Sequence, residues 1–241
     1  MPDFSLELEV LKSYFSEDNS FKGEKQPDFF TKKSLGTAHH HYLIAGVDEA
    51  GCGPWAGPVM AGAVIFPNFE TVPKDLLVLL DDSKKLTEKR RGKAYELLKS
   101  YEGTHCYIGS GLANEAEIDE LNIRQAALLA MKRAVENLPL SPQFSLVDGI
   151  CAPNLQCGVQ TFKKGDSRSF SIAAASIVAK VTRDRLMADL SQKHPEYLWE
   201  KNAGYGTKAH QEALKIHGVT PYHRKSFAPI AKLIHLERKA A

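Results

Sequence analysis

The chain has 241 residues, 43% hydrophobic and 25% charged, which is ordinary for a globular protein with a sizeable core. The net charge of +2 does not by itself identify a polyanionic partner. The four cysteines have no C-x-x-C spacing, and the chain has neither a run of about 18 apolar residues nor a signal peptide. We therefore expect a cytoplasmic protein with reduced thiols and no membrane partner.

The first 41 residues differ from the rest of the chain. Residues 1–20 carry five acids and one base, a net charge of −4, which leaves +6 for the remainder. The apolar positions of residues 1–15 fit either a short helix or a strand. Residues 16–41 are polar and rich in Gly, Pro, Ser and Lys, as in a linker. We treat 1–41 as an N-terminal extension and linker.

From residue 42 to 190 the pattern predicts an α/β core. Apolar runs bounded by Gly, Pro or Asp predict strands over 42–48, 58–66, 105–111, 144–148 and 156–162. Helices are predicted over 87–100, 114–136 and 169–190, and Asn114 with Glu117 resembles a capping box. Residues 191–241, with helical stretches near 207–217 and 225–237, form a predicted C-terminal helical segment.

Carboxylates follow two of the apolar runs. V-D-E-A-G-C-G (47–53) places Asp48 and Glu49 at a strand end, and the following glycines would let the pair escape strict alternation. Asp148 ends the run 144–148, and Asp166 precedes the alanine-rich helix. Four acids at one sheet edge repel one another, and a hard divalent cation relieves that repulsion. The alternatives are a lysine partner for Asp48, an Asp–Gly turn at Asp148 and an N-cap at Asp166.

Basic residues are clustered as well. Residues 83–93 hold six bases, among them Lys84 and Lys85, against one acid. Such a run is either a solvated helix face or a surface that neutralises phosphates. In the tail, Arg224, Lys225 and Ser226 could contact a nucleic-acid backbone; equally, this loop could simply close on the final helix.

Two glycine-rich stretches suggest close contact with a ligand. Gly51, Cys52 and Gly53 leave backbone amides open to a phosphate oxygen, although the stretch is not a Walker loop and also fits a plain turn. Tyr205 lies between Gly204 and Gly206, where a ring can stack on a base or sugar and its hydroxyl can probe a 2′-OH. A single tyrosine is more commonly part of the core or the surface.

These motifs, taken in order, resemble ribonuclease HII, the bacterial type 2 ribonuclease H, over about residues 42–230. The matching stretches are A-G-V-D-E-A-G-C-G-P (45–54), D-S-K-K-L (82–86), E-I-D-E-L-N-I (117–123), V-D-G (147–149), K-G-D-S (164–167), I-A-A-A-S-I-V-A-K-V-T-R-D (172–184), G-Y-G-T (204–207) and H-R-K-S-F (223–227).

The resemblance implies a ribonuclease H-like core, with a central mixed sheet flanked by helices and a C-terminal helical segment. It implies metal-dependent hydrolysis of the RNA strand of RNA–DNA hybrids and incision 5′ of single ribonucleotides in duplex DNA, leaving 3′-hydroxyl and 5′-phosphate ends. The metal-binding acids fall on Asp48, Glu49, Asp148 and Asp166, and the tyrosine that senses the 2′-OH falls on Tyr205.

We expect two Mn²⁺ or Mg²⁺ ions bridged by Asp48, one activating water and the other stabilising the departing 3′ oxygen. Glu49 would also respond to the 2′-OH. The expected partners are RNA–DNA hybrids and ribonucleotide-containing duplex DNA, bound by a monomer. A non-catalytic hybrid-binding protein or a related DNA nuclease on the same fold are the alternatives.

One position departs from the family pattern, which usually has G-R-G where this chain has Gly51-Cys52-Gly53. The change should be mild if the stretch works through backbone amides. It should weaken phosphate binding if the arginine side chain contributes. A thiol beside the acids would also make the site sensitive to oxidation if it is reactive.

Overall fold

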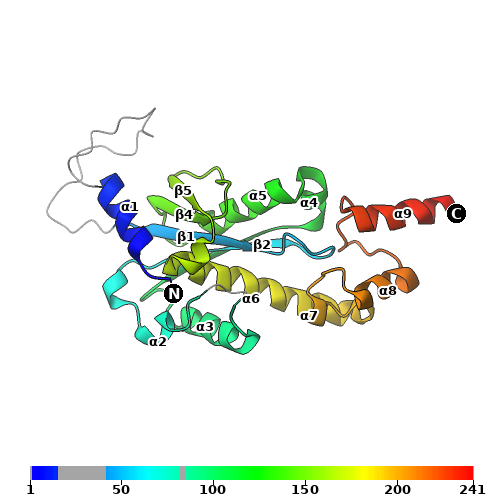
Figure 1. Cartoon of the computed structure of the whole chain (residues 1–241), viewed down its shortest axis with the longest axis horizontal. Coiled ribbons are helices and arrows are strands. Elements are labelled where there is room, and N and C mark those ends of the chain that lie inside the picture. The colour runs from blue at the N-terminus through cyan, green and yellow to red at the C-terminus, as the bar shows by residue number, and fades with distance from the viewer. Residues whose placement is uncertain (1, 16–41, 82–84, 241) are drawn as a thin grey trace.

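A mixed five-stranded sheet forms the centre of the computed structural model, which describes residues 2–15, 42–81 and 85–240 (Figure 1). The strands are β1 (Ile44–Ala50), β2 (Val59–Ile65), β3 (Tyr107–Ala113), β4 (Phe144–Asp148) and β5 (Gly158–Phe162), in the spatial order β3-β2-β1-β4-β5. β1, β2 and β3 pair antiparallel, whereas β4 and β5 run parallel to β1. The carboxyl ends of β1, β4 and β5 therefore lie at one edge of the sheet.

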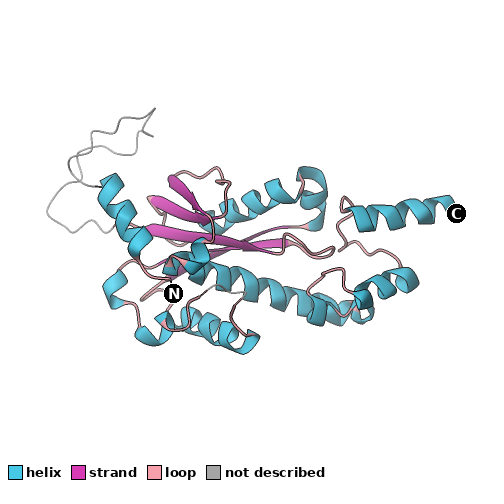
Figure 2. Ribbon diagram, viewed as in Figure 1, coloured by secondary structure: helices cyan, strands magenta, loops and turns pink. Residues whose placement is uncertain are grey.

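Helices cover both faces of the sheet (Figure 2). They are α1 (Ser5–Phe15), α2 (Lys74–Leu77), α3 (Glu88–Ser100), α4 (Glu115–Leu121), α5 (Ile123–Glu136), α6 (Phe170–Lys193), α7 (Trp199–Asn202), α8 (Lys208–His217) and α9 (Ala228–Ala240). Helix α5 packs on one face and α6 on the other. Among the described helices, none is both long and apolar enough to cross a membrane.

Helix α6 lies unusually close to the sheet because the sequence supplies small residues on both sides. Four of its alanines, Ala173, Ala174, Ala175 and Ala179, are fully buried, and a Cβ added at Gly46 or Gly62 would lie 2.0 Å or 2.4 Å from the α6 backbone. The Ser169 hydroxyl accepts the Ile172 amide and so begins the helix. This close packing fixes α6 against β1 and β2.

The structure corrects one sequence prediction and resolves one ambiguity. The single helix predicted over 114–136 is wrong: α4 ends at Leu121, and Asn122, at φ 68°, begins α5 by accepting the amides of Arg124 and Gln125. The capping box at Asn114 and Glu117 is confirmed. The ambiguous residues 1–15 contain helix α1 rather than a strand.

The C-terminal residues pack on the far end of α6. Tyr197, Trp199, Leu214 and Ile230 form one buried cluster with Met187 of α6 and Ala56 of the loop between β1 and β2. A backbone bridge joins Ala56 to His223. The two sequence-distant loops around Ala56 and His223 therefore lie side by side next to the carboxyl end of β1.

Candidate active site

Asp48 and Asp148 lie on neighbouring parallel strands at the same level. Val47 of β1 is opposite Val147 of β4, and each is followed directly by its aspartate. Residues Gly46 and Leu146, one alternation earlier, both face α6, so the two carboxylates point to that face as well. The fold thus brings together two acids that are 100 positions apart.

Asp48 is buried, with 4% of its surface exposed. Burial, together with the negative charges of Glu49 and Asp148, raises the pKa of Asp48 well above its ordinary value. Hydrogen bonds from the Ser176 hydroxyl and the Glu49 amide act in the opposite direction. Among the residues that the structure describes, no lysine or arginine contributes to this pKa shift, so the proposed lysine partner for Asp48 is not supported.

Strand β1 continues through Ala50, past both acids, with Asp48 opposite Gly62 and Glu49 opposite Ala61 in β2. The expectation that the pair escapes strand alternation is therefore wrong. Glu49 leaves the sheet on the α5 face, where the Cys52 thiol donates to its Oε1 at 3.7 Å. The negative charge of Glu49 raises the pKa of Asp48 from the opposite face of the strand.

Asp166 lies in a 3₁₀ turn, η3 (Gly165–Ser167), and is 5% exposed. The Gly165 amide donates to Asp148 Oδ1 at 2.6 Å, which ties this turn to β4. Ser169, not Asp166, caps α6, so the N-cap alternative for Asp166 is excluded. The turn thus carries Asp166 to the strand end that bears Asp148.

The four predicted acids have the all-oxygen chemistry that a hard divalent cation prefers, and the repulsion on Asp48 is what such a cation would relieve. As the side chains are placed, no group of three or more His, Cys, Asp or Glu residues in the described ranges is arranged to hold a metal ion. The donors fit the ion chemically, and a complete ligand set requires side-chain rotation, above all by Glu49.

The loop after β1 is held by two buried arginines. Arg224 is fully buried and donates to the carbonyls of Gly51, Cys52 and Gly57 at 2.6, 3.1 and 2.9 Å. Arg183 of α6 donates to the carbonyls of Ala56, Pro58 and Ala203. The expectation that the Arg224 side chain contacts substrate directly is therefore wrong, because its donors are used within the protein.

These guanidinium groups leave positive charge beneath the loop. Burial and repulsion from Arg183 lower the pKa of Arg224 to about 10, so it stays charged at neutral pH. Gly51 has φ +101°, and a Cβ there would lie 2.1 Å from Arg183 Nε. Only glycine satisfies both constraints, so the first glycine of the motif is needed to seat the loop on Arg183.

Cys52 does not have the properties of a reactive thiol. Burial, followed by the charge of Glu49, raises its pKa to about 12. The thiol stays protonated at neutral pH, which removes the basis for the expected sensitivity to oxidation. All four cysteines are free.

Tyr205 and Gly53 lie against each other. A Cβ added at Gly53 would be 3.2 Å from Tyr205 Cε1, and Tyr205 is 48% exposed, so its ring is available to a ligand. The Gly204 carbonyl accepts the amides of Trp55 and Ala56, which fixes the tyrosine loop to the glycine loop. The two predicted recognition elements therefore form one surface.

A pair of buried histidines supports this surface from below. The Thr220 amide donates to His223 Nδ1, so His223 carries its proton on Nε2 and donates to His210 Nε2 at 3.0 Å. His210 Nδ1 in turn donates to the Tyr205 carbonyl at 2.9 Å. Sequence analysis missed both histidines, although His223 begins the H-R-K-S-F motif quoted above and His210 lies three residues after G-Y-G-T.

The other residues predicted to contact the substrate are Ser226, Lys84 and Lys85. Ser226 is exposed, and its amide and hydroxyl donate to Asp119 at 2.8 and 2.6 Å. Lys85 is exposed and 3.8 Å from Asp81, whereas Lys84 lies outside the described residues. Lys163 and Lys164, exposed directly after β5, are further candidates beside Asp148 that sequence analysis did not assign.

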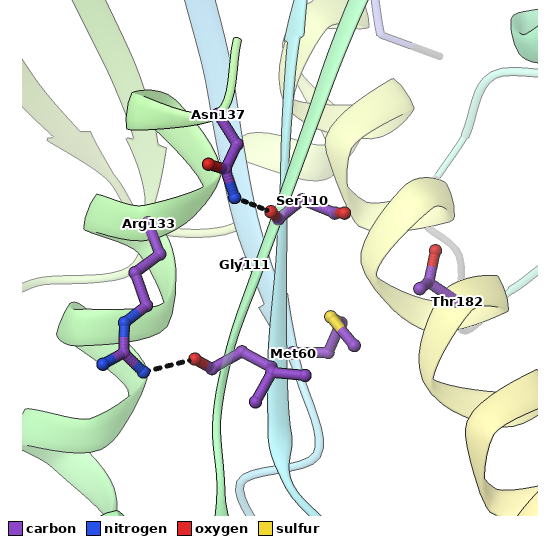
Figure 3. Close-up of a pocket in the computed structure, with 7 residues that line it drawn as sticks. Met60, Ser110, Gly111, Arg133, Asn137 and Thr182 are labelled. Atoms are coloured by element: carbon purple, nitrogen blue, oxygen red, sulfur yellow. Dashed lines mark hydrogen bonds between the residues drawn. The ribbon is translucent and has the colours of Figure 1, made fainter.

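A separate groove crosses the edge strand β3 (Figure 3). Arg133 and Asn137 of α5 donate to the Leu112 and Ser110 carbonyls of that strand. The groove contains none of the predicted site residues. These side chains occupy edge carbonyls and so protect the strand from pairing with another chain.

Comparison with known proteins gives matches over most of the chain. The family model described as Ribonuclease HII matches residues 45–230. The Ribonuclease HII of Gluconobacter oxydans (strain 621H) is 53% identical over 206 residues, which cover 85% of this chain and 97% of that protein.

Solved structures share the fold. The ribonuclease H2 of Pyrococcus horikoshii OT3 has a TM-score of 0.68 at 28% identity, covering 82% of this chain and 99% of that one. Bst-RNase HIII in complex with Mn²⁺ has a TM-score of 0.62 at 17% identity, covering 97% of this chain and 81% of that one. The second likeness concerns the fold alone.

Proposed function

The chain belongs to the ribonuclease HII family and is a ribonuclease H-type endonuclease acting on RNA–DNA hybrids; from this premise we propose that it also incises duplex DNA 5′ of single ribonucleotides. In this proposal each cut leaves a 3′-hydroxyl and a 5′-phosphate. The enzyme acts as a monomer in the cytoplasm, and its partners are hybrids and ribonucleotide-containing duplex DNA.

One observation supports the proposal. The acids Asp48 and Asp148 and the surface formed by Tyr205 and Gly53 all lie near the carboxyl end of β1. Asp48 lies within this strand, and Gly53 follows it by five residues. A phosphodiester at the acids therefore has its sugar within reach of Tyr205, which touches Gly53. Stacking by the ring and a hydrogen bond to the 2′-OH would favour a ribose on the 5′ side of a junction.

Asp48, Glu49, Asp148 and Asp166 are the proposed holders of divalent metal, Mn²⁺ or Mg²⁺. When bound, the metal supplies an activated water and charge stabilisation for the departing 3′ oxygen. Ser176 orients Asp48, and the Gly165 amide orients Asp148. Glu49, on the other face of β1, completes the set by turning around the strand end.

Gly51, Cys52 and Gly53 are the proposed phosphate-binding backbone. The carbonyls of Gly51 and Cys52 are directed inward to Arg224, which favours an outward direction for amides of this loop. Because the loop is seated by backbone contacts, replacement of the family's arginine by Cys52 is compatible with the proposal. Lys84, Lys85 and Ser226 remain proposed contacts to the substrate backbone.

The test is cleavage of duplex DNA that contains one ribonucleotide, with all-DNA duplex and a long RNA–DNA hybrid in parallel. Each is incubated with Mn²⁺, Mg²⁺ or EDTA, and the ends are identified by mass. We expect a metal-dependent nick 5′ of the ribonucleotide and no cutting of all-DNA duplex. Cutting of hybrids alone would reject the junction role of Tyr205, and binding without cutting would reject the metal assignment.

A further inference from the structure

Helix α1 and the residues before it lie outside the region that the family model matches, yet they pack directly on the core. We propose that residues 2–15 brace the turn that carries Asp166, with Glu7 as the positioning residue. This inference rests on the proposed role of Asp166 as a metal ligand.

The first contact is made by backbone. Asp3 forms a parallel bridge with Ser169. Its amide donates to the Arg168 carbonyl at 3.2 Å, and its carbonyl accepts the Phe170 amide at 3.0 Å. The Asp3 side chain then accepts the Ser5 amide at 2.8 Å, at the point where α1 begins. The chain between η3 and α6 is thus hydrogen-bonded to the N-terminal residues on both sides of Ser169.

The second contact is a buried carboxyl group. Glu7 has no exposed surface, and its Oε1 accepts the Ser169 hydroxyl at 2.6 Å and the Ser171 amide at 3.1 Å. Both bonds go to Oε1, whereas the buried Oε2 has no hydrogen-bond partner among the described residues. Because a buried polar group is costly without partners, the two bonds to Oε1 favour the observed position of α1. They also join α1 to the first turn of α6, three residues after Asp166.

The third contact is apolar. Leu6 and Val10 pack with Ile44, Phe144, Leu146 and Ile172 in one buried cluster. Ile172 continues the connection, because a Cβ added at Gly165 would lie 2.6 Å from its Cδ1. Gly165 is the residue whose amide binds Asp148. A chain of direct contacts therefore leads from α1 through Ile172 to the turn that presents Asp166.

Asp166 is consequently held from two sides. On one side Gly165 is bonded to Asp148, and on the other Ser169 is bonded to Asp3 and Glu7. Removing the second anchor takes away the ties between the chain after η3 and the N-terminal residues, while the bond from Gly165 to Asp148 remains. The brace thus predicts an effect on metal binding at Asp166, whereas a helix that only adds stability would leave the affinity of the folded protein unchanged.

The experiment measures Mn²⁺ binding to full-length protein without nucleic acid, by titration calorimetry, for the wild type, Glu7→Ala and Glu7→Gln. Glu9→Gln, an exposed acid on the same helix, is the matched control. We expect Glu7→Ala to weaken Mn²⁺ binding about three- to tenfold, below or at the low end of losses from outer-shell partners of metal ligands. Glu7→Gln should retain most of the affinity because its amide oxygen still accepts both bonds.

Hydrogen exchange on the wild-type protein provides the second measurement and does not depend on any variant folding. The amides of residues 165–172 should open together with those of α1. The brace would be overturned if the amides of residues 165–172 exchange only through global unfolding while the amides of α1 exchange freely. So would an Mn²⁺ affinity of folded Glu7→Ala equal to that of the wild type.

The outcomes separate this inference from the proposed function. If the wild type binds Mn²⁺, Asp166→Asn weakens that binding and no nucleic acid is cut, the function fails while the brace stands. If the wild type cuts ribonucleotide-containing DNA and Glu7→Ala binds Mn²⁺ normally, the brace fails while the function stands. Absence of Mn²⁺ binding to Asp166 in the wild type overturns both.

Discussion

Gly53 lies directly beside the ring of Tyr205, although the two residues are 152 positions apart in the sequence. A Cβ on Gly53 would lie 3.2 Å from Tyr205 Cε1. At that separation an added methyl displaces the ring by a few tenths of an ångström. The glycine therefore sets where the tyrosine can lie.

Gly53→Ala is expected to reduce incision at single ribonucleotides more than cleavage of long hybrids, by roughly tenfold in the ratio of kcat/KM values, because a displaced ring is misplaced at the junction. Tyr205→Phe should shift the ratio in the same direction by removing the hydroxyl that tests the 2′-OH. Both rates are measured on end-labelled substrates. Equal losses on the two substrates would contradict a junction-reading role.

Asp48→Asn should abolish cutting while preserving hybrid binding, and it should also stabilise the metal-free protein. The substitution removes a buried charge that Glu49 and Asp148 repel, and the amide oxygen still accepts the Glu49 amide. We expect the free energy of unfolding in EDTA to rise. Urea denaturation measures this free energy, with the exposed Asp189→Asn as the control. If Asp48→Asn is less stable than the wild type, repulsion from Glu49 and Asp148 does not destabilise the folded protein.

Arg224→Lys should destabilise the protein by about 2–4 kcal/mol, because one ammonium group cannot reproduce the three hydrogen bonds of the guanidinium and leaves buried carbonyls unpaired. Urea denaturation again gives the value. Lys225→Ala, at the exposed neighbour, should change stability little. If Arg224→Lys is as stable as the wild type, the arginine does not hold the glycine loop.

Acid should unfold the C-terminal segment through its histidine pair. Burial, and then the neighbouring His210, lowers the pKa of His223 to about 3, against an ordinary value near 6.5. Between about pH 6.5 and pH 3, His223 is protonated in the unfolded chain but not in the folded chain. The free energy of unfolding therefore falls as the pH drops through this range.

The expected slope is about 1.4 kcal/mol per pH unit for this group in the middle of that range. It is measured by urea denaturation at successive pH values. His223→Gln, which keeps a side-chain polar group near Nε2, should flatten the slope. An unchanged slope in this variant would assign the acid sensitivity to other groups.

Lys163 and Lys164 should contribute to phosphate binding, because they are exposed immediately after β5, next to Asp148 in the register of the sheet. Replacing both by Ala should raise KM, leave kcat unchanged and reduce the slope of log affinity against log salt by about 1 to 2. Lys99→Ala, in helix α3, where the lysine pairs with Glu102, is the control. A loss of kcat without a change in salt slope would exclude phosphate contact.

The sequence alone predicted the five strands, because short apolar runs bounded by Gly, Pro and Asp leave few alternatives. It also singled out Asp48, Asp148 and Asp166, since each adjoins an apolar element in a recognisable motif; that these acids bind metal stays a prediction. It did not predict the break at Asn122, because the residues on both sides are good helix formers and only the positive φ of one asparagine separates the two helices.

Tertiary structure decided which polar groups face inward. The sequence suggests that Arg224 is one base of an exposed H-R-K-S run. In the structure it is fully buried, and it donates to three carbonyls of a loop about 170 positions away. Glu7 reads as one acid of an acidic extension, yet it is fully buried against Ser169. Whether a charge is solvated or satisfied internally depends on partners from distant segments, and local sequence does not contain that information.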